Sequence, residues 1–578
     1  MQLKSLYTPL TYQDFYGNKP DLDKLKASLA KLDKQTLLEY ALTLLHNAES
    51  WSNIDDFIKH FFSEENEELV QKSIFQLYKK YISELNKTSC EIIPQIVILT
   101  KHSCLEFLRV IFSVDFTGEE LSDNTFVKLV IFNWLLVINE KTTQSPILPM
   151  DLDEDMKIAY RALLIMTSYN DFTNINVAEN FTLQCHKSRL LFNFLDKHKN
   201  LQRIKEMYLK EIGCKCWEEY IFVLAKLFIL DHQDKSTSTR IILEKNHPSY
   251  HHDKKILEQF AFSSDVQIPH KENVDFISFR NKPLIRLNEN TYWVIDKTFV
   301  ANRLYRSLFF GLKAQNDIID EQYKQSNFFQ FFTTNFSEET LFYDVMKHII
   351  GKKSYIHHSG AEMRRIGLSG EPDYYVRNEN DIFLFEFKDS LYRKEDKVDR
   401  NYENVKSSIE DKLVHKNNGK SSAIEQLCNN IDLILNDKFH IDSGIRSNKV
   451  NIYPILVVGD PTFTNVGINY ILNDYFRIKI SNRKIENENI RPLILVSIDS
   501  LIVYQFEFEE NKLNLRNVLD RYLEFLNMKT PYMINDIYRN IMHRYFSLDQ
   551  YLRDKVPIKS KKSLLEPLIN AFREIDLT

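Results

Sequence analysis

Apolar residues recur three and four positions apart in several stretches of the first 270 residues. The pattern is clearest in residues 21–48, 66–85 and 216–230. Side chains at this spacing lie on one face of an α-helix, so each stretch predicts an amphipathic helix. No segment recurs at a fixed period, and a helical-repeat array is therefore not expected. We interpret residues 1–270 as a helical region that regulates the rest of the chain or docks a partner.

The pattern changes near residue 283. Two apolar segments, 283–287 and 291–296, flank a polar Asn-Glu-Asn turn, and residues 297–312 return to helical spacing. Apolar segments separated by a short polar turn are typical of a β-hairpin. We therefore expect residues 271–328 to form a hairpin and helix that connect the helical region to the C-terminal part of the chain.

Predicted strands and helices alternate from residue 337 onward. Residues 338–350 have helical spacing and are followed by a loop that extends to residue 372. Strand-like runs follow at 373–376, 382–388, 450–460 and 492–498, with helical spacing at 421–435 and a further helix between the last two strands. This order is typical of an α/β sandwich whose central strands are buried on both faces. The predicted fold class is α/β, with a large, mainly α-helical N-terminal region. We place the α/β domain at residues 329–528 and a helical C-terminal tail at residues 529–578.

The distribution of glycine supports this division. Eight of the 12 glycines lie between Gly351 and Gly467, and the first 310 residues contain only three. Glycine is common in turns and where backbones approach closely. A helical first half and a strand-rich second half are the expected result.

The composition of the chain restricts the classes of protein to which it can belong. A net charge of −5 gives no overall attraction to nucleic acid, so any such site must be a local surface. The six cysteines are few and irregularly spaced, which favours reduced thiols. No apolar stretch has the length and purity of a membrane span. We expect a cytoplasmic protein without a membrane partner.

Candidate chemistry lies in residues 370–390. Glu386 and Lys388 are two positions apart in an apolar run, so on a strand they face the same side. A turn centred on Glu379 and Asn380 would place Asp373 directly opposite Glu386. Two opposed carboxylates repel each other and need a compensating cation. Oxygen ligands favour a hard divalent ion, Mg²⁺, for which Mn²⁺ can substitute.

The pattern Pro372-Asp373, then twelve residues, then Glu386-x-Lys388 resembles the signature of the PD-(D/E)XK, or restriction-endonuclease-like, nuclease superfamily. The resemblance covers residues 329–528. It implies that Asp373 and Glu386 bind the metal, helped by the Phe387 carbonyl, and that Lys388 orients or activates the attacking water. It also implies a restriction-endonuclease-like sandwich.

The resemblance suggests further site residues, each with an alternative. Many members carry an acidic residue on the preceding helix, where Glu338 and Glu339 both qualify. Either acid has a structural explanation, because Asn335 to Glu338 also has the form of a capping box at a helix start. Gln426 resembles a glutamine that some members place on the following helix, and a surface glutamine is the alternative. The basic residues just upstream of the hairpin are candidates for phosphate contacts: Lys352, Lys353, Arg364 and Arg365.

These features together predict a metal-dependent nuclease that hydrolyses phosphodiester bonds. By analogy with similar nucleases, we expect a DNA endonuclease effector of a prokaryotic antiviral defence or restriction system. An RNase on the same fold and a non-catalytic nuclease-like scaffold subunit are the alternatives. The expected partners are nucleic acid, with DNA favoured over RNA, and a protein partner or a second copy bound through the helical region.

Overall fold

The computed structural model describes residues 7–51, 53–64, 67–88, 95–117, 124–142, 155–169, 176–229, 240–351, 353–415, 422–485, 488–528 and 543–574. The chain folds into two compact units, and each unit is discontinuous in sequence. Unit 1 contains residues 146–207 and 309–578, and unit 2 contains residues 2–145 and 208–308. The chain therefore passes between the units at three places.

The division between the units differs from the expected boundary at residue 270. Helices α8 (Asp155–Tyr169) and α9 (Val177–Asp196) belong to unit 1, although they lie in the first half of the sequence. On α9, the ring of Phe194 packs against Phe331 and Phe336. Amphipathic spacing shows that a helix buries one face but not which partner covers it.

Unit 2 is mainly helical, as expected. The predicted helices are present, but residues 21–48 form two helices, α2 (Leu22–Ala30) and α3 (Lys34–Asn47), because Asp33 caps a new helix by accepting from the Thr36 N–H. Its other helical segments are α1 (Tyr12–Tyr16), α4 (Ile54–Phe61), α5 (Glu68–Thr88), α6 (Lys101–Ser113), α7 (Asn124–Thr142), α11 (Trp217–Ile229), α12 (Tyr250–Phe260), η2 (Val274–Phe276), α13 (Ile277–Asn281) and α14 (Lys297–Leu304).

The predicted hairpin of unit 2 is confirmed. Strands β5 (Leu284–Arg286) and β6 (Thr291–Val294) pair antiparallel, and α14 follows them. They form the centre of a four-stranded sheet with the order β3-β6-β5-β4, in which β3 is Arg240–Ile242 and β4 is Ala261–Ser263. A separate pair of short parallel strands joins β1 (Tyr7–Pro9) to β2 (Gln95–Val97).

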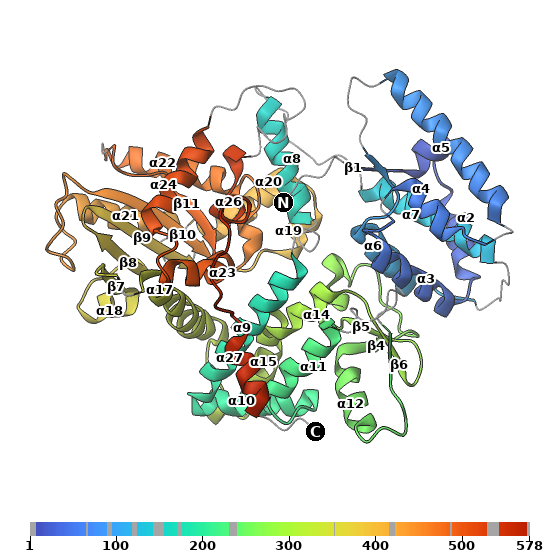
Figure 1. Cartoon of the computed structure of the whole chain (residues 1–578), viewed down its shortest axis with the longest axis horizontal. Helices are drawn as coiled ribbons and strands as arrows, with labels where there is room; N and C mark the ends of the chain where they lie inside the picture. Colours follow the sequence, from blue (N-terminus) through green and yellow to red (C-terminus); the bar gives the residue numbers. More distant parts are fainter. Residues whose placement is uncertain are drawn as a thin grey trace. The chain divides into compact units, whose positions relative to one another are not determined.

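Unit 1 contains a five-stranded mixed sheet with the order β11-β10-β9-β8-β7 (Figure 1). The four predicted strands are β8 (Tyr374–Asn378), β9 (Asp381–Lys388), β10 (Asn451–Val458) and β11 (Ile494–Ser497). β9, β10 and β11 run parallel, whereas β8 is antiparallel to β9. β7 (Ile356–Ser359) and α18 (Gly360–Arg365) occupy a segment expected to be a loop. β7 is a partly exposed edge strand and lacks the apolar alternation that predicts strands.

Helices cover both faces of this sheet. On one face, Ile382 and Leu384 of β9 join a core formed with α20 (Tyr402–Leu413), α21 (Ala423–Leu435), α22 (Ile468–Asn482) and α8. On the other face, Phe387 stacks on Phe342 with 5.1 Å between ring centroids, and Phe383 stacks on Tyr453. Tyr453 in turn donates to Asp520 of α24 (Leu515–Asn527). β9 is apolar on both sides because both sides are buried.

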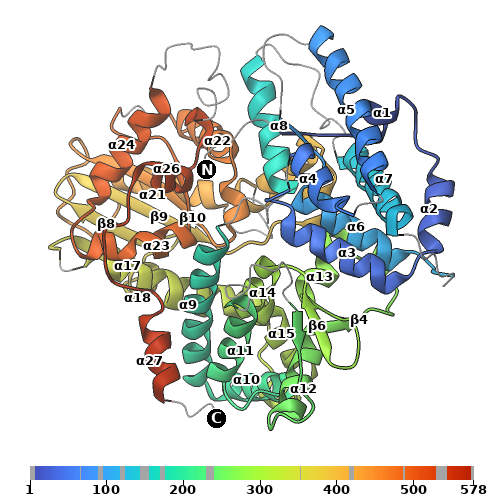
Figure 2. The same cartoon turned by 45° about the vertical axis from the view of Figure 1, so that its right-hand side comes forward.

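The remaining segments of unit 1 complete this arrangement (Figure 2). In the expected tail, residues 529–542 lie outside the described ranges, and α26 (Leu548–Lys555) packs on the sheet through Asp549, which accepts hydrogen bonds from Ser497 and Ser500. The other segments are η3 (Glu321–Tyr323), α16 (Phe328–Phe331), η4 (Phe332–Phe342), α17 (Tyr343–Ile350), α19 (Lys394–Val398), η5 (Pro461–Thr464), α23 (Ile498–Glu509), η7 (His543–Tyr545) and α27 (Glu566–Glu574). Two helices, α10 (Lys199–Ile212) and α15 (Arg306–Ile318), have residues in both units.

The observed class is thus mixed α/β with a large helical part. In the described ranges, no helix combines the length and apolar character that crossing a membrane requires.

Candidate active site

The β8–β9 hairpin brings two carboxylates together. Tyr374 pairs with Phe385 and Asn378 with Asp381, so Asp373, one residue before β8, lies opposite Glu386. The turn is at Glu379 and Asn380, with Glu379 at a φ of 53°. A positive φ is uncommon for a residue other than glycine, but a two-residue hairpin turn requires it. The register expected from the sequence is confirmed.

Both carboxylates are buried, and their partners differ. Asp373 is 7% exposed and accepts a hydrogen bond from the Phe387 N–H, with an N to Oδ2 distance of 2.7 Å. Glu386 is 0% exposed, and its Oε1 accepts from Lys388 Nζ at 2.7 Å. Within the described residues, Glu386 Oε2 is buried without a hydrogen-bond partner. A buried carboxylate oxygen without a partner is costly, and this cost marks the atom as a site for a ligand.

Lys388 is held between the hairpin and α21. Its Nζ lies 3.1 Å from Gln426 Oε1, so the glutamine predicted from the sequence does reach the lysine. One turn later on α21, Asn430 donates to the carbonyl oxygens of Gln426 and Gly370. Asn430 was not predicted from the sequence, although its spacing of four residues from Gln426 places both on one helix face.

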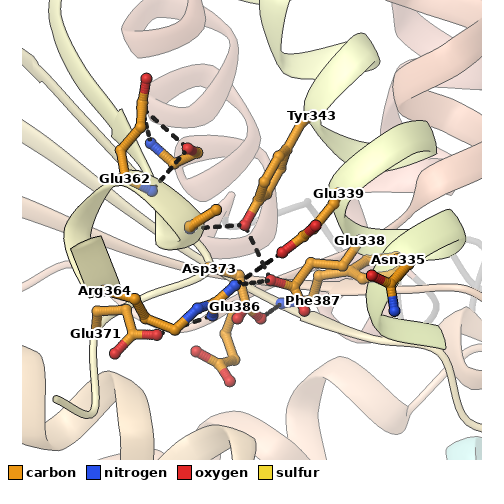
Figure 3. A network of polar contacts seen from close by, with 12 residues as sticks. Asn335, Glu338, Glu339, Tyr343, Glu362, Arg364, Glu371, Asp373, Glu386 and Phe387 are labelled. Atoms are coloured by element: carbon orange, nitrogen blue, oxygen red, sulfur yellow. Dashed lines mark hydrogen bonds and ion pairs between the residues drawn. The ribbon is translucent and has the colours of Figure 1, made fainter. Parts of the chain in front are cut away.

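The structure separates the two candidate acids on the preceding helix. Glu338 lies among the site residues with a side chain only 14% exposed, and the Tyr343 hydroxyl donates to its Oε1 at 2.9 Å. Glu339 is 36% exposed and pairs with Arg364 at 3.2 Å. Glu338 is therefore the acid that faces Asp373 and Glu386 (Figure 3).

A capping box at Asn335 does not explain these acids. The helical chain begins at Phe328, and the Asn335 side chain donates to the Phe331 carbonyl inside a continuous helix. Residues Phe332–Phe342 are wound as a π-helix, a form that is rare and is often found at functional sites. Glu338 thus lies well inside a helix, where no unpaired N–H groups of a helix start need it.

Two of the basic residues expected to contact phosphate, Arg364 and Lys353, bind other groups of the protein. Arg364 bridges Glu371 at 2.9 Å and Glu339 at 3.2 Å, and it lies 3.6 Å from Glu338. Lys353 donates to the carbonyl oxygens of Ile349 and Phe508. Arg365 is exposed, and position 352 is outside the described residues. Arg364 thus compensates part of the negative charge beside the hairpin (Figure 3).

Burial and repulsion shift the ionisation of the site. The pKa of Glu386 is raised well above its ordinary value by burial and by Asp373, against the opposing effect of Lys388. Burial also raises the pKa of Asp373. The pKa of Glu338 is raised to about 7 by burial and by Asp373. Burial lowers the pKa of Lys388, but Glu386 and Asp373 outweigh this effect and raise it, so the lysine is charged.

The charged groups at the end of the hairpin suit a bound divalent cation better than a self-contained ion pair between Lys388 and Glu386. Lys388 is within hydrogen-bond distance of Glu386, whereas Asp373 and Glu338 add negative charge that this one cation does not balance. Among the described residues, no three His, Cys, Asp or Glu side chains already converge as a complete metal site. Mg²⁺ commonly binds through one or two carboxylates and keeps several waters, which is what Asp373 and Glu386 offer.

Comparisons with family models, with curated proteins and with solved structures returned no significant match to this chain.

Proposed function

We propose that this chain is a Mg²⁺-dependent nuclease of the PD-(D/E)XK type, with unit 1 as its restriction-endonuclease-like catalytic domain. The observation that carries the proposal is the fully buried Glu386, whose Oε2 has no hydrogen-bond partner among the described residues and whose strand neighbour across the hairpin is Asp373. A structural hairpin has no reason to oppose two buried carboxylates. A hairpin that binds a cation requires such a pair, because the two carboxylates are the ligands.

Asp373 and Glu386 would hold the ion, with Glu338 and the Phe387 carbonyl as further ligands. When bound, such an ion stabilises the charge that develops on phosphorus oxygens and lowers the pKa of a water. The orphaned oxygen of Glu386 and the repulsion within the pair fit this role.

Lys388 lies beside Glu386 at the C-terminal end of β9, and its charge would orient the attacking water and contact the scissile phosphate. Gln426 fixes the ammonium group from α21, so that the lysine does not depend on Glu386 alone for its position. Preorganised charge of this kind stabilises a transition state without reorganisation during the reaction.

DNA is the proposed substrate, and a role in prokaryotic antiviral defence or restriction rests on analogy with similar nucleases. The test is to incubate the full-length purified protein with Mg²⁺ or Mn²⁺ and with plasmid, linear DNA or RNA, with EDTA as the control. Cleavage of DNA that EDTA abolishes is expected. Cleavage of RNA alone would make the protein an RNase, and cleavage of neither substrate together with no Mg²⁺ binding would overturn the proposal.

A further inference from the structure

The Tyr343 hydroxyl links three parts of the site. It receives a hydrogen bond from the Ala361 N–H at 3.2 Å, and it lies 2.9 Å from Glu338 Oε1. A backbone N–H can only donate, so the hydroxyl oxygen accepts from Ala361. Its own hydrogen is then free for the carboxylate, which accepts hydrogen bonds when ionised. When Glu338 is ionised, these hydrogen bonds therefore run from Ala361 to Tyr343 to Glu338.

The π-helical winding brings Tyr343 next to Glu338. The two residues are five positions apart, and in an α-helix such residues point roughly 140° away from each other. A π-helix closes its hydrogen bonds from residue i to i+5, so its wider turn brings positions five apart onto nearly the same side. Residues Phe332–Phe342 have this winding, and Tyr343 follows directly. The π-helix therefore brings the Tyr343 hydroxyl within hydrogen-bond distance of the Glu338 carboxylate.

Gly360, the residue before Ala361, lies close to both Tyr343 and Asp373. Its N–H donates to the Asp373 carbonyl at 2.8 Å. A Cβ at this position would lie 3.2 Å from the Tyr343 hydroxyl and 3.3 Å from the Asp373 backbone. The start of α18 therefore packs closely against both the Tyr343 hydroxyl and the Asp373 backbone, and a Cβ there would require these neighbours to shift slightly.

We propose that Tyr343 is a positioning residue, which holds the Glu338 carboxylate toward Asp373 so that both can share one Mg²⁺ ion. The hydroxyl acts through Glu338 and does not itself touch the substrate. This inference rests on the proposed function, because it assigns Glu338 to the same metal site. Hydrogen-bond partners of metal ligands typically contribute 10- to 100-fold to metal affinity.

Tyr343→Phe tests the inference in the full-length protein, because it removes only the hydroxyl. The matched control is Tyr374→Phe: the Tyr374 ring packs 5.7 Å from that of Tyr343, but its hydroxyl meets His357. Calorimetric titration with Mg²⁺ should show roughly tenfold weaker binding for Tyr343→Phe. The control should bind Mg²⁺ within twofold of wild type. Cleavage by Tyr343→Phe should recover at high Mg²⁺, because the defect lies in affinity.

A double-mutant cycle separates positioning from a general loss of packing. If Tyr343 acts through Glu338, then Tyr343→Phe combined with Glu338→Gln should bind Mg²⁺ as weakly as Glu338→Gln alone. Gly360→Ala, which presses on the hydroxyl, should weaken Mg²⁺ binding in the same direction as Tyr343→Phe. Effects of Tyr343→Phe and Glu338→Gln that simply add would overturn the inference, as would Tyr343→Phe binding like wild type.

The wild-type protein distinguishes the positioning role from the proposed function. If it binds Mg²⁺ and cuts DNA while Tyr343→Phe is unchanged, the positioning role falls and the proposed function stands. If the wild-type protein neither binds Mg²⁺ nor cleaves, the proposed function falls and the positioning role falls with it.

Discussion

Two β-hairpins, β5–β6 in unit 2 and β8–β9 in unit 1, differ in how the charged groups on them are paired. In unit 2, Arg286 and Tyr292 are cross-strand partners on β5 and β6, and both bind the carboxylate of Glu258, at 2.9 and 2.8 Å. In unit 1, the residues opposed at the open end of the β8–β9 hairpin are two carboxylates, Asp373 and Glu386, and both are buried. The first arrangement stabilises a hairpin, whereas the second costs stability.

The pairing of charges on each hairpin indicates its role. Removing a carboxylate from water costs several kcal/mol in practice, and a cation must compensate for it. Departures from locally favourable chemistry concentrate at functional sites. We therefore propose that the β8–β9 hairpin carries the chemistry and that the β5–β6 hairpin has a structural role.

The largest expected effect comes from removing either opposed carboxylate. Glu386→Ala and Asp373→Ala should each abolish Mg²⁺ binding and lower cleavage by about a thousandfold or more, because both groups are proposed ligands of the ion. Without metal, neither variant should be less stable than wild type beyond its lost packing, since repulsion is relieved. Calorimetry, a cleavage assay and thermal melts in EDTA measure these effects. Full activity in Glu386→Ala would show that the active site does not lie on the β8–β9 hairpin.

Lys388→Met should separate catalysis from metal binding. Both carboxylates remain, so Mg²⁺ should still bind within a few-fold of wild type. Loss of the charge that orients the water should lower cleavage by roughly 10²- to 10⁴-fold. The same titration and cleavage assays apply, and equal losses of binding and cleavage would contradict the separate role given to the lysine.

The metal-free protein should lose stability as the pH rises. The folded-state pKa of Glu338, about 7, lies above its ordinary value of 4.5, so the folded state binds more protons between these values than the unfolded state does. The contribution of Glu338 is therefore fully present below pH 4.5 and is lost as the pH rises to 7 and beyond. We expect the Tm in EDTA to fall by a few degrees over this window.

Two further samples check the origin of that pH effect. Glu338→Gln should flatten the decline in Tm, and Mg²⁺ should offset it at pH 8, where the carboxylates are available as ligands. A decline of the same size in Glu338→Gln would assign the effect to other groups.

The smallest expected effect is in the hairpin of unit 2. Arg286 is 35% exposed and its partner Glu258 is 32% exposed, so solvent screens the pair. Arg286→Ala should cost about 1 kcal/mol or less in stability. Cleavage and Mg²⁺ affinity should not change. If Arg286→Ala lost as much activity as Lys388→Met, the β5–β6 hairpin would also contribute to function.

The sequence by itself determined the strands of the site and their register. A two-residue turn and the period of two along a strand are local properties, so Asp373, Glu386 and Lys388 could be placed on one face from their spacing alone. The hairpin of unit 2 was predictable for the same reason. The order of strand-like and helical patterns, together with the distribution of glycine, also gave the mixed class, since both depend on local backbone preferences.

The choice between Glu338 and Glu339 could not be made from the sequence. The sequence left both acids open, and the structure has a π-helix at Phe332–Phe342, whose winding differs from that of the α-helix that a sequence pattern predicts. A change of winding rotates every later side chain about the helix axis, and nothing in a short apolar pattern signals it. The long-range partners of the site, such as Arg364 with Glu371, are likewise brought together only by the folded backbone.

Tertiary structure alone decided where α8 and α9 belong. Their apolar faces predict burial, and the sequence order suggested burial within the first 270 residues. In the structure, Phe194 packs against Phe331 and Phe336, on the helix that carries Glu338. Hydrophobic burial is non-directional and scales with area, so an apolar face is equally compatible with many partners. Which partner it meets is set by complementary shape across the whole fold, and that information is spread over residues far apart in the chain.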